Sequence, residues 1–262
     1  MSKITQAFQN GKSLIVFITG GDPNVETTER LIPAITEAGA DLIEIGIPFS
    51  DPIAEGPIIQ AASKRSLESG TTTAKLLEMV ARVRRNVHVP ILFMTYLNPV
   101  YVYGKERFLS ACRDAGIDGI IVPDMPFEEK GELSENCTEF GINLISMVAP
   151  TSHKRIAKIA QAAEGFLYCV SSLGVTGMRS KINTDIEQII VHAKKYTNVP
   201  CAIGFGISDA NQAKAMAKIA DGVIVGSAIV KIIAEHGCDC IEPVKNFVQM
   251  MKEAIENTAA PT

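Results

Sequence analysis

Two glutamates of this chain, Glu44 and Glu55, have the residue type and the placement for acid–base chemistry. Glu44 lies in the run Leu42 to Ile47, whose isoleucines predict a strand. Glu55 follows in a segment rich in Pro and Gly, which predicts a loop. Carboxyl groups in such different environments can divide the roles of proton donor and proton acceptor. The alternative is a buried structural carboxylate and a solvated loop residue, because ion pairs also perturb carboxyl groups.

The surrounding chain alternates short apolar segments with longer amphipathic ones. The apolar segments predict strands over residues 13–19, 41–47, 90–96, 118–122, 143–148, 166–170, 200–203 and 221–225. Helices are predicted between them, including 105–115, 128–140, 153–163, 184–196 and 209–219, and a last helix over 242–257. Nearly continuous apolar strands are typical of parallel sheets with helices on both sides.

These units predict an α/β fold with a single (β/α)8 barrel domain over residues 1–262. An extra helix in the first ten residues and additional helices in the βα units complete the prediction. The alternative is an open doubly wound sheet, which the sequence favours less because no GxGxxG motif follows the first strand.

Composition narrows the class of protein. The net charge is -4 and the pI about 5.7, whereas a nucleic-acid surface is usually basic. No apolar run has the length of a membrane span, and the first ten residues lack the apolar core of a signal peptide. The six cysteines form no CxxC motif, which predicts free, buried thiols in a cytoplasmic protein.

Active sites of α/β barrels form at the carboxyl ends of the strands. The residues predicted there are mostly apolar or aromatic: Phe17, Thr19, Glu44, Met94, Tyr96, Pro123, Asp124, Tyr168, Phe205, Gly226 and Ser227. This set suits a flat hydrophobic substrate. No lysine lies at a strand end, which disfavours a Schiff-base aldolase, and none of the four histidines does, so no metal site is predicted.

Glycine-rich loops follow the last three predicted strands. They are Gly174 to Gly177, Gly204 to Ser208 and Gly226 to Ala228. Barrel enzymes commonly bind phosphate at the loops after strands seven and eight, with backbone N–H groups at a helix N-terminus. Glycines that merely form tight turns are the alternative, but adjacent loops of this kind favour a phosphorylated ligand.

Seven segments together resemble the tryptophan synthase α subunit family: EIGIPFSDPIAEGPIIQ, GGDP, LNPVYVYG, PDMPFEE, SSLGVTGMR, IGFGIS and GSAIVKII. They occur in the same order through nearly the whole chain. The resemblance implies a barrel that cleaves indole-3-glycerol phosphate to indole and glyceraldehyde 3-phosphate. It also implies a pyridoxal-phosphate β subunit as partner in an α2β2 heterotetramer, with indole passed to it, and no cofactor in this chain.

The resemblance also implies roles for individual residues. Glu44 would protonate indole C3, Glu55 would take or polarise the indole N–H, and Tyr168 would lie near the glycerol. The remaining roles are an indole pocket from Phe17, Met94, Tyr96 and Phe205, a closing loop with Thr176 and Gly177, phosphate-binding backbone at Gly177, Gly206, Gly226 and Ser227, and a β-subunit contact at Asp51 and Pro52. The chain departs from the family at Glu55, where Asp is usual, and at Met94, where Leu is usual.

The departure at Glu55 leaves a second hypothesis open. The chain would then be a binding or regulatory subunit that keeps the phosphate site without efficient catalysis. A third hypothesis, another phosphate-binding barrel such as a sugar-phosphate isomerase or epimerase, does not account for the PFSDP segment. Further apolar candidates for a partner surface are Pro99, Tyr101 and Tyr103, which alternatively pack on the barrel rim.

Overall fold

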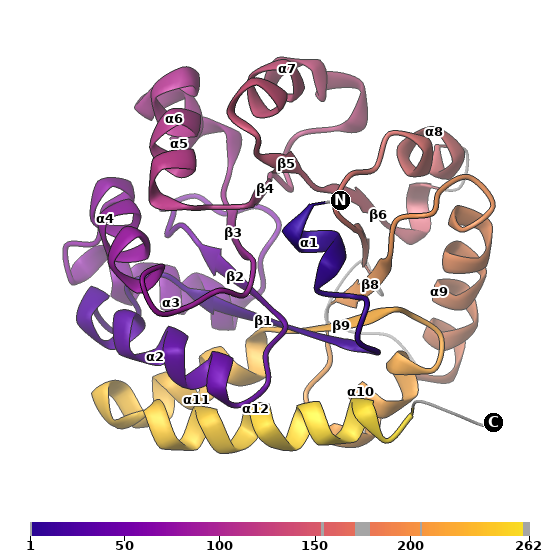
Figure 1. The fold of residues 1–262 in the computed structure, drawn as a ribbon. Helices are drawn as coiled ribbons and strands as arrows, with labels where there is room; N and C mark the ends of the chain where they lie inside the picture. The colour runs from indigo at the N-terminus through magenta and orange to yellow at the C-terminus, as the bar shows by residue number, and fades with distance from the viewer. Residues whose placement is uncertain (1, 153–154, 171–178, 205, 259–262) are drawn as a thin grey trace.

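The computed structural model describes residues 2–152, 155–170, 179–204 and 206–258, and its strands form one parallel sheet surrounded by helices (Figure 1). The strands are β1 (Ser13–Thr19), β2 (Leu42–Gly46), β3 (Ile91–Met94), β4 (Gly119–Ile121), β5 (Asn143–Leu144), β6 (Ser146–Val148), β7 (Leu167–Val170), β8 (Cys201–Gly204) and β9 (Gly222–Val225). Their order in the sheet is β5-β4-β3-β2-β1-β9-β8-β7-β6.

The α-helices cover the outside of this sheet. They are α1 (Lys3–Gln6), α2 (Val25–Glu37), α3 (Pro57–Glu68), α4 (Thr73–Val83), α5 (Leu97–Tyr103), α6 (Lys105–Ala115), α7 (Gly131–Phe140), α8 (Ile156–Gln161), α9 (Arg179–Ala193), α10 (Ala210–Ala217), α11 (Ser227–His236) and α12 (Ile241–Glu256). Single 3-10 turns occur at Phe127–Glu129, Pro150–Ser152 and Gly237–Asp239. None of the helices in the described part of the chain has the length and apolarity to cross a membrane.

The sheet closes through the segment predicted as one strand over residues 143–148. That prediction is wrong in one respect, because the segment forms two short strands on either side of Ile145. β5 pairs with β4, and β6 pairs with β7. The Ile145 N–H donates to the Ile120 carbonyl at 2.9 Å, so the backbone turns from one neighbour to the other without a gap. The predicted α/β barrel is confirmed, and the open doubly wound alternative is excluded.

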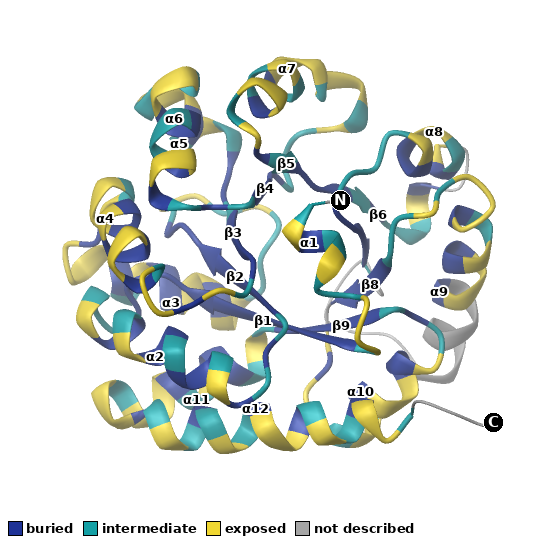
Figure 2. Cartoon of the chain, in the orientation of Figure 1, coloured by how far each residue is buried: buried dark blue, intermediate teal, exposed yellow. Residues whose placement is uncertain are grey.

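Alternation along the strands separates an inner core from an outer one. On β1, Leu14, Val16 and Ile18 belong to the apolar layer between sheet and helices, whereas Ile15 belongs to the cluster inside the barrel. Both faces of the strands are therefore buried, and the helices expose only their outward sides (Figure 2). Side chains at odd positions of β1 consequently point into the barrel.

The N-terminal helix α1 closes the amino-terminal opening of the barrel, where Figure 1 shows it across the strands. Ile4 is fully buried and packs in the inner cluster. Gly119 and Gly165 lie at the amino ends of β4 and β7, and a Cβ atom on either would lie 3.0 or 3.1 Å from Ile4 side-chain atoms. The absence of a side chain at these two positions thus makes room for the Ile4 side chain, which fills the amino-terminal opening of the barrel.

Several predicted helix boundaries differ from the structure. Helix α5 (Leu97–Tyr103) was not predicted, because Pro99 suggests a break; the helix accommodates this proline in its first turn, where the backbone N–H has no intrahelical partner. The predicted helix 128–140 begins as a 3-10 turn before α7. The predicted helix 153–163 is shorter, as α8 (Ile156–Gln161), with residues 153–154 outside the described parts. α9 extends further toward the N-terminus than predicted.

We predict that Ile4→Ala lowers the free energy of unfolding of the chain by about 2–5 kcal/mol, because it removes a fully buried side chain and leaves a cavity. The matched control is Ile53→Ala, since Ile53 is 81% exposed and its truncation should change stability by less than about 0.5 kcal/mol. Urea unfolding followed by circular dichroism measures both. Equal effects of the two substitutions would contradict a plugging role for α1.

Candidate active site

Glu44 lies inside the barrel on β2, with Phe17 of β1 and Leu92 of β3 as its register partners. The side chain is fully buried, and neither carboxyl oxygen has a hydrogen-bond partner among the described residues. Burial disfavours the charged form and raises the pKa of Glu44 to about 8. Glu44 is therefore protonated at neutral pH, the state required of a proton donor.

Glu55 lies in the loop between β2 and α3, held by backbone contacts on both sides. The Ala54 N–H donates to the Tyr96 hydroxyl at 3.0 Å, and Gln60 Nε2 donates to the Glu55 carbonyl at 2.8 Å. Burial raises the pKa of Glu55 to about 7, and a hydrogen bond from Tyr96 opposes part of this shift. The pKa of Glu55 is thus raised less than that of Glu44, a difference that suits one carboxyl group as acid and the other as base.

Helix α3, which follows the Glu55 loop, is fixed to the end of β1 by an ion pair. Arg65 donates to both carboxylate oxygens of the buried Asp22, at 2.9 and 2.7 Å. The Ser66 hydroxyl also donates to the Gly20 carbonyl at 2.6 Å. Bidentate pairs of this kind fix orientation as well as distance. The Arg65–Asp22 pair was not predicted from the sequence, where its partners lie far apart.

Tyr168 projects into the barrel from β7 and packs against Phe166, with ring centroids 6.3 Å apart. Burial, and secondarily the charge of Glu44, raises the pKa of Tyr168 well above its usual range. The influence of Glu44 shows that the two side chains face the same interior space. Gly204 of β8 makes room for this ring, because a Cβ atom there would overlap the Tyr168 hydroxyl. Tyr168 thus remains a hydrogen-bond donor at any physiological pH.

Phe17 provides an apolar wall beside Glu44. It packs with Met94 of β3, Ile59 and Ala62 of α3, and Val230 of α11. The strands on either side of Phe17 carry glycines: a Cβ atom on Gly46 would lie 2.8 Å from Phe17 Cζ, and one on Gly226 would lie 3.2 Å from Phe17 Cβ. The ring therefore occupies space that side chains on β2 and at the end of β9 would otherwise fill.

The predicted phosphate-binding backbone lies at the start of α11. Gly226 is the residue before the helix, no side chain caps the helix, and Ser227 at its first position is exposed. Gly206 after β8 has φ +80°, a conformation that favours glycine. Free N–H groups at a helix N-terminus can bind an anion. Phe205, Thr176 and Gly177 lie outside the described residues.

Exposed apolar side chains occur next to the predicted partner contact at Asp51 and Pro52 in the chain, and on helix α5. Asp51 is exposed and Pro52 is partly exposed. Ile53 and Val102 are each 81% exposed and Tyr101 is 44% exposed, so we define these three side chains as the apolar rim patch. Tyr103 instead packs on the core against Phe108, as the rim alternative predicted. Ile53 of the loop and Val102 of helix α5 were missed because sequence does not reveal which apolar residues stay uncovered.

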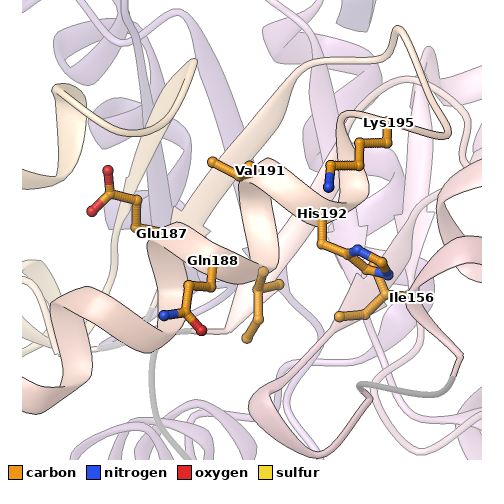
Figure 3. A pocket seen from close by; sticks show the side chains of 7 residues that line it. Ile156, Glu187, Gln188, Val191, His192 and Lys195 are labelled. Carbon is orange, nitrogen blue, oxygen red and sulfur yellow. The ribbon is translucent and has the colours of Figure 1, made fainter.

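An open groove of about 650 Å³ lies elsewhere, on the outer wall of the barrel. Figure 3 shows Glu187, Gln188, Val191 and His192 on one helix beside Ile156, with Lys195 nearby. None of the predicted site residues lines this groove. We assign the site to the strand ends instead, because the carboxyl groups with raised pKa values lie there.

Comparison with known proteins gives consistent matches over nearly the whole chain. A family model for the tryptophan synthase alpha chain matches residues 4–259. The alpha chain of Halalkalibacterium halodurans is 49% identical over 247 residues, covering 94% of this chain and 93% of that protein. The alpha chain of Thermoanaerobacter pseudethanolicus is 45% identical over 262 residues, covering 97% of this chain and 100% of that protein.

Solved structures match as well. A tryptophan synthase subunit alpha from Legionella pneumophila superposes with a TM-score of 0.90 at 34% identity, covering 98% of this chain and 99% of that one. A chain from a structure of the tryptophan synthase α2β2 complex of Pyrococcus furiosus superposes with a TM-score of 0.85 at 37% identity, covering 92% and 98% of the two chains.

The raised pKa of Glu44 predicts a pH-dependent stability. The carboxyl ionises near 4.5 in the unfolded chain and near 8 in the folded one, so its contribution is fully present below pH 4.5 and is lost as the pH rises through 8. Glu44→Gln cannot ionise. We expect the stability of this variant relative to the parent to rise over that interval, by up to about 1.4 kcal/mol per pH unit.

Urea unfolding at a series of pH values measures this difference. Glu68→Gln, which alters an exposed glutamate of α3, controls for the loss of one surface carboxyl. A difference between Glu44→Gln and the parent that stays constant with pH would show that the folded state does not raise the pKa of Glu44.

Proposed function

The chain belongs to the tryptophan synthase alpha chain family, and from this premise we propose how its residues cleave indole-3-glycerol phosphate to indole and glyceraldehyde 3-phosphate. The observation that carries the proposal is the buried, partner-free Glu44 carboxyl at the same barrel opening as Glu55. The reaction is a retro-aldol, in which the bond between indole C3 and the glycerol carbon breaks. It needs one acid and one base held in an environment that excludes water.

Glu44 acts first as the acid. Its pKa of about 8 supplies a protonated carboxyl at neutral pH. Proton transfer to indole C3 turns the ring into a cation that can accept the electrons of the breaking C–C bond. As that bond breaks, the hydroxyl on the adjacent carbon becomes the aldehyde carbonyl and gives its proton to the Glu44 carboxylate. The proton count of the enzyme is thereby restored.

Glu55 acts on the indole nitrogen. Protonation at C3 places positive charge on N1, and a carboxylate beside the N1–H stabilises that charge. The pKa of about 7 gives Glu55 a large ionised fraction at neutral pH while Glu44 keeps its proton. Tyr96 sets the position of this carboxylate through its hydrogen bonds with the loop. Tyr168, which stays protonated, can donate to the glycerol part of the substrate.

The remaining residues of the site bind the substrate and take no part in proton transfer. Phe17 and Met94 form the apolar wall for the indole ring, with Phe205 as the third proposed member. The N–H groups at Gly226, Ser227 and Gly206 bind the phosphate. These roles require no metal or cofactor in this chain, and we assign the pyridoxal phosphate to a β subunit.

We place the β subunit at the apolar rim patch beside Asp51 and Pro52. Ile53 of this patch lies in the loop that carries Glu55, so a partner that covers it contacts the element that positions a catalytic carboxylate. The Pyrococcus furiosus relative was solved as an α2β2 complex for which mutual activation is described. We propose the same heterotetramer here, in the cytoplasm, where the free thiols of all six cysteines remain reduced.

The first test is release of indole from indole-3-glycerol phosphate by the purified chain, alone and with a β subunit. We expect slow release alone, a strong increase with the partner, and loss of release by at least about 100-fold in Glu44→Gln. Retained phosphate-ligand binding in Glu44→Gln would show that the fold is intact. No release by the parent chain under either condition would contradict the proposal and favour a binding subunit that has lost catalysis.

A second prediction concerns the residue that departs from the family. Glu55→Asp shortens the side chain by one methylene and withdraws the carboxylate from Tyr96, so we expect kcat/KM to fall by about 10- to 100-fold. Glu55→Gln, which keeps the length and removes the charge, is the matched variant and should be impaired at least as much. Faster cleavage by Glu55→Asp would instead mean that glutamate itself reduces catalysis in this chain.

A further inference from the structure

We propose that Thr19, at the end of β1, is an additional substrate-binding residue whose hydroxyl pairs with a hydroxyl of the glycerol chain. The proposal rests on the proposed function and adds a specificity determinant to it. The starting observation is a set of buried side-chain oxygens that lack a hydrogen-bond partner in the described parts of the chain. They are Thr19 Oγ1, both carboxyl oxygens of Glu44, and Glu55 Oε2.

The set is small and belongs to one place in the fold. Buried hydroxyl groups are normally paired, because an unpaired one loses its hydrogen bonds to water without replacement. Two of the three residues in the set are the carboxylates to which the reaction is assigned. Thr19, with 1% of its surface exposed, is the third and has no assigned role. A protein retains such a group at a cost in stability, which is expected where a ligand supplies the partner.

The register places Thr19 on the inner face of the barrel. β1 and β2 pair in parallel with Phe17 opposite Glu44 and Thr19 opposite Gly46. Residues two apart on a strand point to the same side, so Thr19 shares the interior with Ile15 and Phe17, whereas Ile18 packs in the outer layer. Gly46 offers no side chain to the Thr19 hydroxyl, and Phe17 occupies the adjoining space with an apolar ring.

Strand order shows which part of the substrate meets Thr19. β1 lies between β2, which carries Glu44, and β9, which leads to the proposed phosphate site at Gly226 and Ser227. The substrate has its reacting carbon at the first site and its phosphate at the second. The chain that joins them therefore crosses in front of the end of β1. That chain carries hydroxyl groups, and a threonine hydroxyl can both donate to and accept from a hydroxyl.

All the oxygens of this set are closed off from solvent together in the unliganded protein. A substrate that reaches the Glu44 carboxyl, beside Phe17 in the register, also reaches the end of β1 where the Thr19 hydroxyl lies. The hydroxyl is thus paired only in the complex. This predicts opposite consequences for stability and for binding when the hydroxyl is removed.

The test uses Thr19→Val, which keeps the shape and removes the hydroxyl, and Thr19→Ser, which keeps the hydroxyl. Binding is measured by calorimetry in a Glu44→Gln background so that substrate is not consumed. The two ligands are indole-3-glycerol phosphate and indole-3-propyl phosphate, whose chain carries no hydroxyl. We expect Thr19→Val to weaken binding of the first ligand by about 10-fold and of the second by less than about 2-fold, and Thr19→Ser to keep near-parental binding of both.

Stability of the unliganded protein provides the independent readout. We expect Thr19→Val to melt no lower than its parent, because the hydroxyl it removes is unpaired. Thr28→Val is the matched control: Thr28 is equally buried, but its hydroxyl accepts from the Gly21 N–H at 2.9 Å and donates to the Asn24 carbonyl at 3.2 Å. This control should melt a few degrees lower.

Three results would overturn the inference. Equal weakening of the binding of both ligands by Thr19→Val would indicate a change of shape alone, and no weakening of the binding of either ligand would mean that the hydroxyl does not contact the substrate. A fall in melting temperature like that of Thr28→Val would mean that the Thr19 hydroxyl is already paired. Failure of the proposed function is distinguishable, because the chain with both Thr19 and Glu44 intact would then release no indole from indole-3-glycerol phosphate.

Discussion

The closure of the parallel sheet is the constraint on which the site depends. Side chains alternate between the interior and the helix-covered face, so a shift of one residue in the β1–β2 register would move Glu44 into the outer apolar layer. The register is fixed along five residue pairs, from Ile15 with Leu42 to Thr19 with Gly46. Closure through the break at Ile145 then brings β7, and with it Tyr168, across from Glu44. Local pairing geometry thus assembles residues that are distant in sequence.

Closure also removes water from the carboxyl groups, and the degree of removal differs between them. Glu44 has no compensating donor in the described structure, so burial alone raises its pKa to about 8. Glu55 is less buried and receives a hydrogen bond from Tyr96, so its pKa rises only to about 7. The order of the two values follows from these contacts rather than from residue type, because both groups are glutamates. Two identical side chains therefore differ in pKa, as the proposed roles of acid and base require.

Sequence was sufficient for the parts of this molecule that depend on local pattern. Apolar runs located the strands, except that the run 143–148 divides into β5 and β6. The rule that barrel sites form at carboxyl strand ends predicted that Glu44, Tyr168 and the glycine loops share one region. It was insufficient where the outcome depends on a distant partner. The Arg65–Asp22 pair joins α3 to the end of β1, and nothing in either segment indicates the other.

The predictions for helix α5 and for the break at Ile145 failed for a related reason. Pro99 usually interrupts a helix, and only its position in the first turn makes it acceptable. The run 143–148 is apolar throughout, and its division reflects the two different neighbours that it must pair with. Exposure of Ile53 and Val102 was equally unpredictable, because periodicity describes which face is apolar and not whether another chain covers it.

The distribution of volume inside the barrel links these observations. Large rings from β1 and β7 enter the interior, and glycines on β2, β8 and at the end of β9 make room for them: Gly46 and Gly226 for Phe17, and Gly204 for Tyr168. Glycine has no side chain with which to donate or accept a hydrogen bond. The arrangement that excludes water from Glu44 therefore also removes possible partners for it and for Thr19.

Each unpaired buried oxygen of this kind lowers stability by about 1–3 kcal/mol in proteins generally. A substrate with a ring nitrogen, hydroxyl groups and a phosphate can provide the hydrogen-bond partners that the interior lacks. The unpaired oxygens that destabilise the free protein therefore favour binding of this substrate over molecules without such groups. On this argument, the polar atoms that the fold leaves unsatisfied define the substrate better than the apolar walls do, because many flat molecules fit beside Phe17 and few carry hydrogen-bonding groups at all of these positions.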